Sequence, residues 1–207
     1  MNKQDLIAKY GKKFASVSHT TPILQGVHYA KDGSIYATNR YYALHIKDAH
    51  QLSHTLTVHA KNGVPIPGDY PDVTKVFTNH RTQREILISG KDLPSVLLIA
   101  SCALLAAKKL DKNFQKVSLM TVVNGMTYLQ LRNEELQLEF SAHIGNTDKL
   151  EESKISLNAE YLHAALSLFY DADSSLIRVK IGSVFESMVI EDEEQGISVL
   201  LLPYRTA

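Results

Sequence analysis

The chain has 207 residues, of which 44% are apolar and 21% are charged. This composition is typical of a globular protein that buries a sizeable core, as one large domain or two small ones. The 22 basic and 22 acidic side chains give a formal net charge of zero, which excludes overall charge as a reason for tight nucleic-acid binding and leaves only local patches.

The first 80 residues contain one predicted helix and a predicted hairpin. Residues 4–17 carry apolar side chains at helical spacing. Residues 23–30 and 34–47 are strand-like, and the Asp-Gly pair between them is a strong hairpin signal. Residues 48–80 contain Asn-Gly, Pro-Gly and Pro-Asp turn signals, so this segment is the best candidate for a linker or domain boundary.

Two further helices are predicted, each followed by strands. Asp92 can cap a helix that runs to about residue 109, and its apolar character nearly all round predicts that it is mostly buried. Asn158 can cap a third helix with one apolar face. Strand-like runs after these helices lie at residues 117–123, 127–131, 136–142, 176–181, 185–190 and 197–202.

The order of one helix followed by strands thus occurs three times, starting near residues 4, 92 and 159. Repetition at the level of pattern favours a fold built from similar units. Antiparallel meanders with helices gathered on one side form an α+β fold. We therefore predict an α+β protein made of repeated helix-plus-meander units.

The sequence predicts a cytoplasmic location without a membrane partner. The N-terminal residues lack the apolar region of a signal peptide, and the longest apolar run, residues 96–107, is too short to span a bilayer. The single cysteine, Cys102, lies in this run and excludes an internal disulfide, so we expect a buried, inert thiol.

The nine histidines raise the question of a metal or hydrolase site. His50 and His54 have the spacing of a helical pair, but no Glu accompanies them as in the zinc protease pattern. With one cysteine, a structural zinc site is disfavoured as well. We expect no catalytic residues, no metal and no cofactor, with a His/Asp hydrolase as a remote alternative.

Four segments, in this order along the chain, resemble the bacterial DNA polymerase III beta subunit, or sliding clamp, family. They are residues 32–39 (DGSIYATN), 68–77 (GDYPDVTKVF), 161–166 (YLHAAL) and 198–205 (SVLLLPYR). The second is similar to the family's Gly-x-Phe-Pro-Asp connection between its middle and last domains. The fourth is similar to the family's closing Tyr-Val-Val-Met-Pro-Met-Arg-Leu.

This resemblance implies DNA-clamp-like repeats, with a truncated or divergent organisation. Residues 1–80 would form a partial clamp-like domain, a half unit plus linker, and residues 81–207 a complete clamp-like domain. One departure is local: the family's Asp-Gly-His-Arg is replaced by residues 39–42, Asn-Arg-Tyr-Tyr, so that Arg40 stands at the glycine position. Another is the replacement of the family's final Leu by residues 206–207, Thr-Ala.

The resemblance also implies an apolar pocket that receives a short extended peptide motif from replication or repair proteins. The positions that carry over are Thr38, Tyr41, Tyr42, Val76, Leu200, Leu202, Pro203, Tyr204 and Arg205. The alternative is that Leu200 and Leu202 are ordinary core residues of a strand.

A clamp holds DNA by enclosing it, so modest positive charge on the inward helices is sufficient. The candidate DNA-facing residues are Lys9, Lys12, Lys13, Lys108, Lys109 and Lys112. The alternative is that lysines near a helix C-terminus only complement the helix dipole. Any binding to double-stranded DNA is expected to be weak, sequence-independent and sensitive to salt.

The leading hypothesis is a non-catalytic, sliding-clamp-like replication accessory protein, or processivity factor. It would bind partner peptides and encircle DNA as a homo-oligomer, because one chain carries too few domains to close a ring. The alternative is a protein-interaction module that kept the clamp fold and the pocket without forming a ring.

Overall fold

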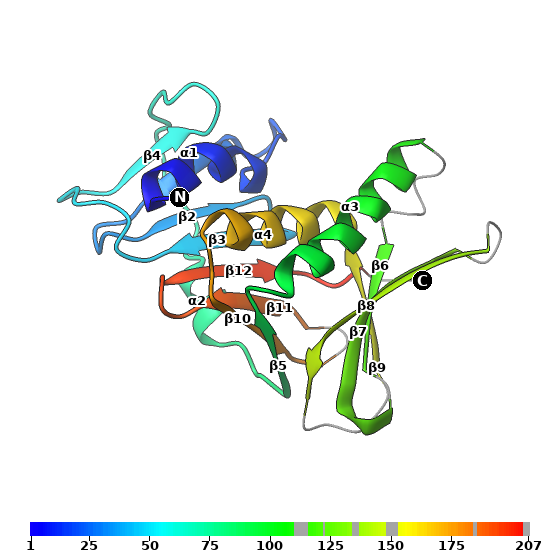
Figure 1. The fold of residues 1–207 in the computed structure, drawn as a ribbon. Coiled ribbons are helices and arrows are strands. Elements are labelled where there is room, and N and C mark those ends of the chain that lie inside the picture. The colour runs from blue at the N-terminus through cyan, green and yellow to red at the C-terminus, as the bar shows by residue number, and fades with distance from the viewer. Residues whose placement is uncertain (110–115, 122, 134–136, 148–152, 184–185, 205–207) are drawn as a thin grey trace.

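The computed structural model describes a two-sheet α+β protein, which confirms the predicted fold class (Figure 1). The described residues are 1–109, 116–121, 123–133, 137–147, 153–183 and 186–204. The helices are α1 (Lys3–Phe14), η1 (Pro22–Gln25), α2 (Thr74–Thr78), α3 (Leu93–Lys109), η3 (Val123–Gly125) and α4 (Ala159–Asp171).

All strand pairs in the two sheets are antiparallel. The eight-stranded sheet has the order β4-β1-β2-β3-β12-β11-β10-β5, and the four-stranded sheet has the order β8-β7-β6-β9. The strands are β1 (Gly26–Tyr29), β2 (Ile35–Thr38), β3 (Tyr42–Ile46), β4 (Leu56–His59), β5 (Arg84–Ser89), β6 (Lys116–Thr121), β7 (Met126–Asn133), β8 (Leu138–Asn146), β9 (Ser153–Asn158), β10 (Leu176–Ile181), β11 (Met188–Asp192) and β12 (Ile197–Leu201).

The pairing of β3 with β12 joins the N-terminal strands to the C-terminal strands in one sheet. Leu44 lies opposite Val199, and Tyr42 lies opposite Leu201. The backbone N–H of Leu202 then donates to the carbonyl of Tyr41 at 2.9 Å, which extends this pairing beyond the strand. Segments about 150 residues apart in the chain are therefore hydrogen-bonded side by side.

Three helices, α1, α4 and α3, lie on the same face of the larger sheet (Figure 1). The α1 helix begins at the cap Asn2, whose side chain accepts from the N–H of Asp5 at 2.9 Å, and α4 begins at the cap Asn158. Leu6, Tyr10 and Phe14 recur at helical spacing and are fully buried against the sheet.

Alternation along the strands gives the large sheet a second apolar face. In β12, Ile197, Val199 and Leu201 belong to the main core, while Leu200 points to the opposite side. There Leu200 packs with Ala43 and Val189, and Phe77 of the short α2 covers this small cluster.

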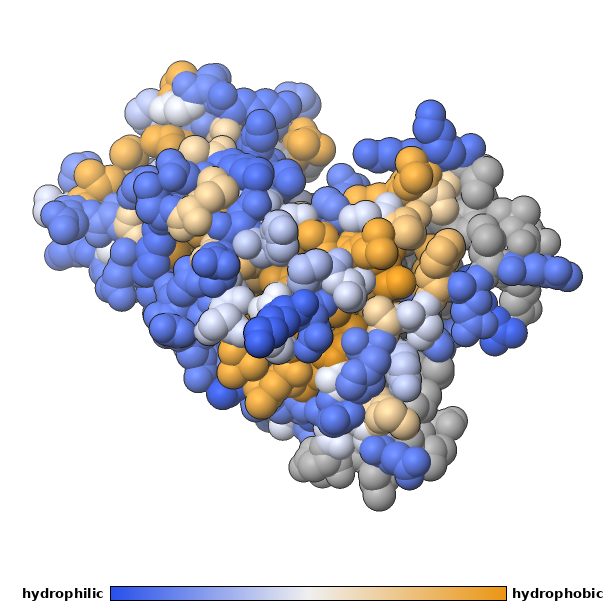
Figure 2. Space-filling model, viewed as in Figure 1, coloured by the Kyte–Doolittle hydropathy of each residue, from blue (hydrophilic) through white to orange (hydrophobic). Residues whose placement is uncertain are grey.

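The α3 helix differs from its prediction, because it is not mostly buried. Its contacts with α4 and with the smaller sheet cover only part of its surface. Leu98 is 60% exposed and Leu105 is 62% exposed. Figure 2 shows the corresponding apolar surface over α3 on the helix-bearing face. A helix that is apolar on all sides can be buried on all sides, but the buried fraction of its surface depends on how many elements pack against it.

Two local predictions also require correction. The segment after residue 21 opens with the 3-10 helix η1 rather than with a strand, because Pro22 suits the first position of a helix. The short α2 helix falls in the predicted linker. None of the helices in the described part of the chain is long and apolar enough to cross a membrane.

Candidate functional site

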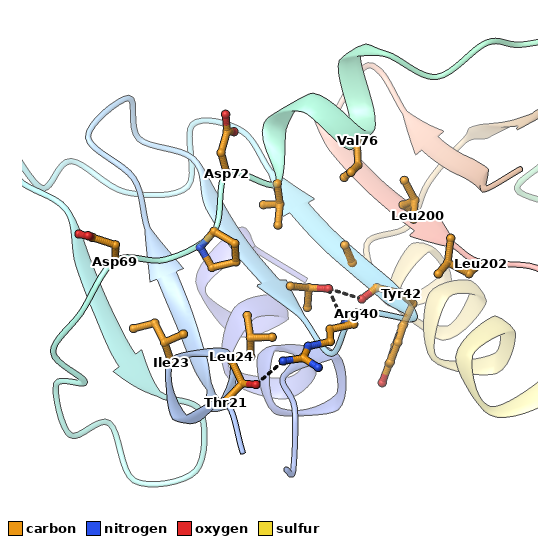
Figure 3. Close-up of a pocket in the computed structure, with 14 residues that line it drawn as sticks. Thr21, Ile23, Leu24, Arg40, Tyr42, Asp69, Asp72, Val76, Leu200 and Leu202 are labelled. Atoms are coloured by element: carbon orange, nitrogen blue, oxygen red, sulfur yellow. Dashed lines mark hydrogen bonds between the residues drawn. The ribbon is translucent and has the colours of Figure 1, made fainter. Parts of the chain in front are cut away.

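An open pocket of about 630 Å³ lies on the face of the large sheet opposite the three helices (Figure 3). Thr38 of β2 and Ala43 of β3 form its floor, between the ends of the strands. Leu200 and Leu202 form the wall contributed by β12 and the residue after it. Residues from both ends of the chain therefore meet in one pocket.

The other walls come from η1 and from the connection that leads into α2. Ile23 and Leu24 of η1 lie along one side. Pro71, Val73 and Val76 lie along the other, with the Val76 side chain directed toward the pocket in Figure 3. The lining is therefore mainly apolar, which suits the burial of an apolar group of a ligand.

Leu202 is the more exposed of the two leucines in this wall. It is 40% exposed, whereas Leu200 beside it is buried in the cluster with Ala43 and Val189. The alternative that both leucines are ordinary core residues therefore describes Leu200 but does not describe Leu202.

The turn between β2 and β3 is held by side-chain hydrogen bonds. The Thr38 hydroxyl donates to the carbonyl of Tyr42 at 2.8 Å and accepts from the N–H of Arg40 at 3.1 Å. The side-chain Oδ1 of Asn39 accepts from the N–H groups of Tyr41 at 2.9 Å and Tyr42 at 3.1 Å. These bonds hold Arg40 at a φ of 80°, in the left-handed region.

Tyr42 connects this turn to the helices. Its ring stacks on Tyr161 of α4 at 4.2 Å and packs against Phe14 of α1 at 4.7 Å between ring centroids. Its hydroxyl donates to the carbonyl of Lys13. Burial raises the pKa of Tyr42 well above its ordinary value, so the phenol stays neutral and remains a hydrogen-bond donor.

The structure brings together part of the set of pocket residues that the resemblance implied. Those lining the pocket are Thr38, Tyr42, Val76, Leu200 and Leu202. Tyr41, Pro203 and Tyr204 are described residues outside this lining, and Arg205 lies outside the described residues. The chain leaves the pocket here because the N–H of Tyr204 donates to the carbonyl of Ser156 in β9 at 2.6 Å.

Sequence reasoning missed several lining residues. Asp69, Pro71, Asp72 and Val73 lie within residues 68–77, so the family-like segment itself was a signal for them. The wall from residues 21–24 carried no such signal, because it reaches the pocket only through the packing of η1 beside β1 and β4.

The candidate DNA-facing lysines that the structure describes lie at the other face of the sheet, on α1 and α3. Lys9 forms an ion pair with Asp171 of α4. Burial, followed by repulsion from Lys9, lowers the pKa of Lys13. Lys12 and Lys109 are exposed, and Lys112 lies outside the described residues.

His163 on α4 is electrostatically coupled to the lysines of both neighbouring helices. Burial is the largest cause that lowers the pKa of His163, and repulsion from Lys13 of α1 and Lys108 of α3 lowers this pKa further. Lys13 and Lys108 therefore both disfavour a proton on His163, and a bound anion would reduce this repulsion.

Two histidines of the N-terminal half, His45 and His50, have local structural partners. His45 stacks on Tyr36 at 4.6 Å, and a ring nitrogen of His50 lies 3.1 Å from the carbonyl of Ser34. Among the residues that the structure describes, no cluster of three or more His, Cys, Asp or Glu side chains is placed to hold a metal ion.

Comparison with known proteins assigns the fold. No family model matches the sequence, and no curated protein matches it. Among solved structures, a DNA polymerase sliding clamp from Bacillus subtilis matches the whole chain with a TM-score of 0.78 at 20% identity, and the beta subunit from DNA polymerase of Streptococcus pyogenes with 0.78 at 15%. A sliding clamp from Pseudomonas aeruginosa bound to griselimycin matches with 0.77 at 13%.

The chain thus belongs to the class of α+β proteins built from helix-plus-meander units around antiparallel sheets. More particularly, it has the fold of the bacterial DNA polymerase III beta sliding clamp, which confirms at the level of the fold the resemblance seen in the sequence. The chain spans 64% or 65% of the length of the three solved structures named above.

Proposed function

We propose that this chain is a non-catalytic accessory protein of DNA replication, which binds short apolar peptide segments of partner proteins in the pocket beside Leu202. The single observation that carries the proposal is the mainly apolar pocket of about 630 Å³ in a chain with the sliding-clamp fold. One structural neighbour is described as bound to griselimycin, so a protein of this fold does take up a ligand.

DNA association is the second part of this proposal. The helix-bearing face carries Lys9, Lys12 and Lys13 on α1 and Lys108 and Lys109 on α3, with His163 between the two groups on α4. Because the net charge is zero, binding would depend on this face and would be weak and salt-sensitive.

Two assemblies are compatible with the proposed function. A closed oligomer would encircle DNA, whereas a monomer or simple dimer would act as an interaction module that binds the same peptides. Light scattering separates the two assemblies by mass.

The division into a partial clamp-like domain at residues 1–80 and a complete one at residues 81–207 is also part of the proposal.

The test of the pocket is Leu202→Asp. A carboxylate on the apolar wall should weaken peptide binding at least about thirtyfold, because loss of a central anchor contact costs on the order of 2 kcal/mol or more. The half-exposed position should leave the fold intact, which circular dichroism checks. The measurement is fluorescence anisotropy with labelled peptides that carry a Leu-Leu-Phe anchor.

The matched control is Leu176→Asp at the start of β10. The Leu176 side chain is 46% exposed, similar to the 40% of Leu202, and it lies outside the pocket. The Leu176→Asp protein should bind the same peptides as tightly as the wild type does. Equal binding by a folded Leu202→Asp protein would show that the pocket is not the peptide site.

A further inference from the structure

The backbone of Arg40 has a conformation that normally belongs to glycine. Its φ of 80° lies in the left-handed region, where a side chain with a Cβ is strained. The four hydrogen bonds of the turn at residues 38–42 hold it there. In the sliding-clamp pattern a glycine stands at this position, and glycine adopts this backbone conformation without strain. The conformation of the turn therefore does not explain why this chain has an arginine here. Strained residues that persist often serve a site through their side chains.

The Arg40 side chain lies across the pocket. Figure 3 shows the guanidinium between the η1 wall and the wall of Tyr42 and Leu202, where it donates a hydrogen bond to the hydroxyl of Thr21. Thr21 is a neutral partner. Within the described part of the chain, no carboxylate forms an ion pair with Arg40, although Asp69 and Asp72 line the same pocket.

The two aspartates are not placed to neutralise this cation. Asp72 accepts from the hydroxyl and the N–H of Thr74 and pairs with Lys75 at 3.3 Å. In Figure 3 the carboxylates of Asp69 and Asp72 point away from the guanidinium. The pocket therefore combines a mainly apolar lining and two carboxylates that do not pair with Arg40 with the permanent positive charge of Arg40. The planar fork of N–H donors on this guanidinium matches the geometry of a ligand carboxylate.

We infer that this pocket selects peptides that carry a carboxylate next to the apolar anchor, and that Arg40 is the residue that recognises it. The inference rests on the proposed peptide-binding function. An apolar anchor seated between Leu202 and η1 would bring its neighbouring group to the guanidinium and displace water from around it. The charge-assisted hydrogen bonds between them strengthen as water is excluded.

The carboxylate can come from an Asp or Glu side chain or from the end of a peptide. The probes are fluorescein-labelled peptides with a common Leu-Leu-Phe anchor, flanked on either side by Asp, Asn or Lys and closed by a C-terminal amide. One further pair carries no Asp and differs only in a free acid or an amide at the C-terminus. Comparison of these arms identifies the source of the carboxylate.

The quantity measured is a ratio of dissociation constants, that of the amide peptide divided by that of its matched acid peptide. The matched pairs are Asn against Asp beside the anchor, and the C-terminal amide against the free C-terminal acid. In the wild type we expect a preference of about tenfold for the acid, which diminishes as salt is added because screening weakens the ion pair. Arg40→Gly should reduce the ratio to below about twofold. Glycine adopts a φ of 80° without strain, so this variant should fold with a Tm no lower than that of the wild type.

Two further variants define the role of the guanidinium. Arg40→Lys keeps the charge but not the planar fork, so an intermediate ratio is expected. Arg81→Gly removes an exposed arginine outside the pocket and should keep the wild-type ratio.

The outcomes separate this inference from the function on which it rests. If peptides bind in a manner that depends on Leu202, but acid and amide bind equally or Arg40→Gly keeps the preference, Arg40 is not the selecting residue and the peptide site stands. If no peptide of the set binds, or if binding ignores Leu202→Asp, the proposed function itself is wrong.

Discussion

At the scale of single residues, similar side chains near the pocket have different roles. Tyr41 is exposed, whereas Tyr42 is buried between Phe14 and Tyr161 and donates a hydrogen bond to the carbonyl of Lys13. The family resemblance implied that both tyrosines belong to the pocket. In the structure, Tyr42 secures the helices to the turn, and the cation of the turn comes from Arg40.

His45 leads to a prediction about the dependence of stability on pH. Burial, assisted by Lys47 and opposed by Asp32, lowers its pKa from 6.5 to about 4. Its ring stacks on Tyr36 and lies 5.5 Å from Phe77. As pH falls from 6.5 toward 4, the unfolded chain binds a proton at this site and the folded protein does not, so stability is present above this window and is lost within it.

We therefore expect His45→Gln to flatten the loss of unfolding free energy across this pH window. Urea denaturation at several pH values measures the slope. His54→Gln, at an exposed position, is the control for the same substitution and should follow the wild type. An unchanged slope in His45→Gln would contradict a neutral, buried His45.

At the scale of elements, α1, α4 and α3 form a layer whose outer face carries both charge and apolar surface. Lys13 and Lys108 flank His163, while Leu98 and Leu105 expose apolar area on α3. Lys13 of α1 and Lys108 of α3 both act electrostatically on His163 of α4, so the positive charges of the two outer helices meet at this histidine. The ion pair of Lys9 with Asp171 partly neutralises the α1 end.

Charge reversal at this point tests DNA association. We expect Lys13→Glu with Lys108→Glu to abolish retention of a random-sequence DNA duplex at low salt, because loss of phosphate contacts removes counterion release. Fluorescence anisotropy of a labelled duplex across a salt series measures the binding of DNA. Lys31→Glu with Lys61→Glu, in exposed turns, makes the same change in net charge and should bind like the wild type. Tight, sequence-selective binding at physiological salt would be inconsistent with a clamp-like contact.

At the scale of the whole molecule, the N-terminal strands depend on the C-terminal ones. The β3 strand pairs with β12, α1 contacts α4, and Tyr10 and Lys9 both bind Asp171. The partial clamp-like domain proposed at residues 1–80 therefore completes its sheet and its core with groups from outside itself.

This dependence predicts different behaviour of the two parts. Residues 81–207 alone should fold with a cooperative thermal transition, whereas residues 1–80 alone should not, because β3 loses its partner β12 and α1 loses the α4 helix beside it. A segment of this size has little core to compensate for these losses. Circular dichroism melting of each fragment measures the difference. A sharp transition in residues 1–80 alone would show that the N-terminal part is independent.

The sequence by itself determined the fold class and most of the elements. Helical spacing in residues 4–17, the candidate caps Asp92 and Asn158 and the strand-like run at residues 176–181 predicted helices and strands near their observed places. These signals depend on neighbours within a few residues. The four family-like segments indicated the clamp fold, which the solved sliding-clamp structures share.

Only the tertiary structure decided which side chains share the pocket and which parts of α3 stay exposed. The η1 wall meets Leu202 because strands about 150 residues apart are paired, and Arg40 enters the pocket because the hydrogen bonds of its turn hold it in a left-handed conformation. Such contacts depend on long-range pairing and on competing packing, which local patterns in a sequence do not encode.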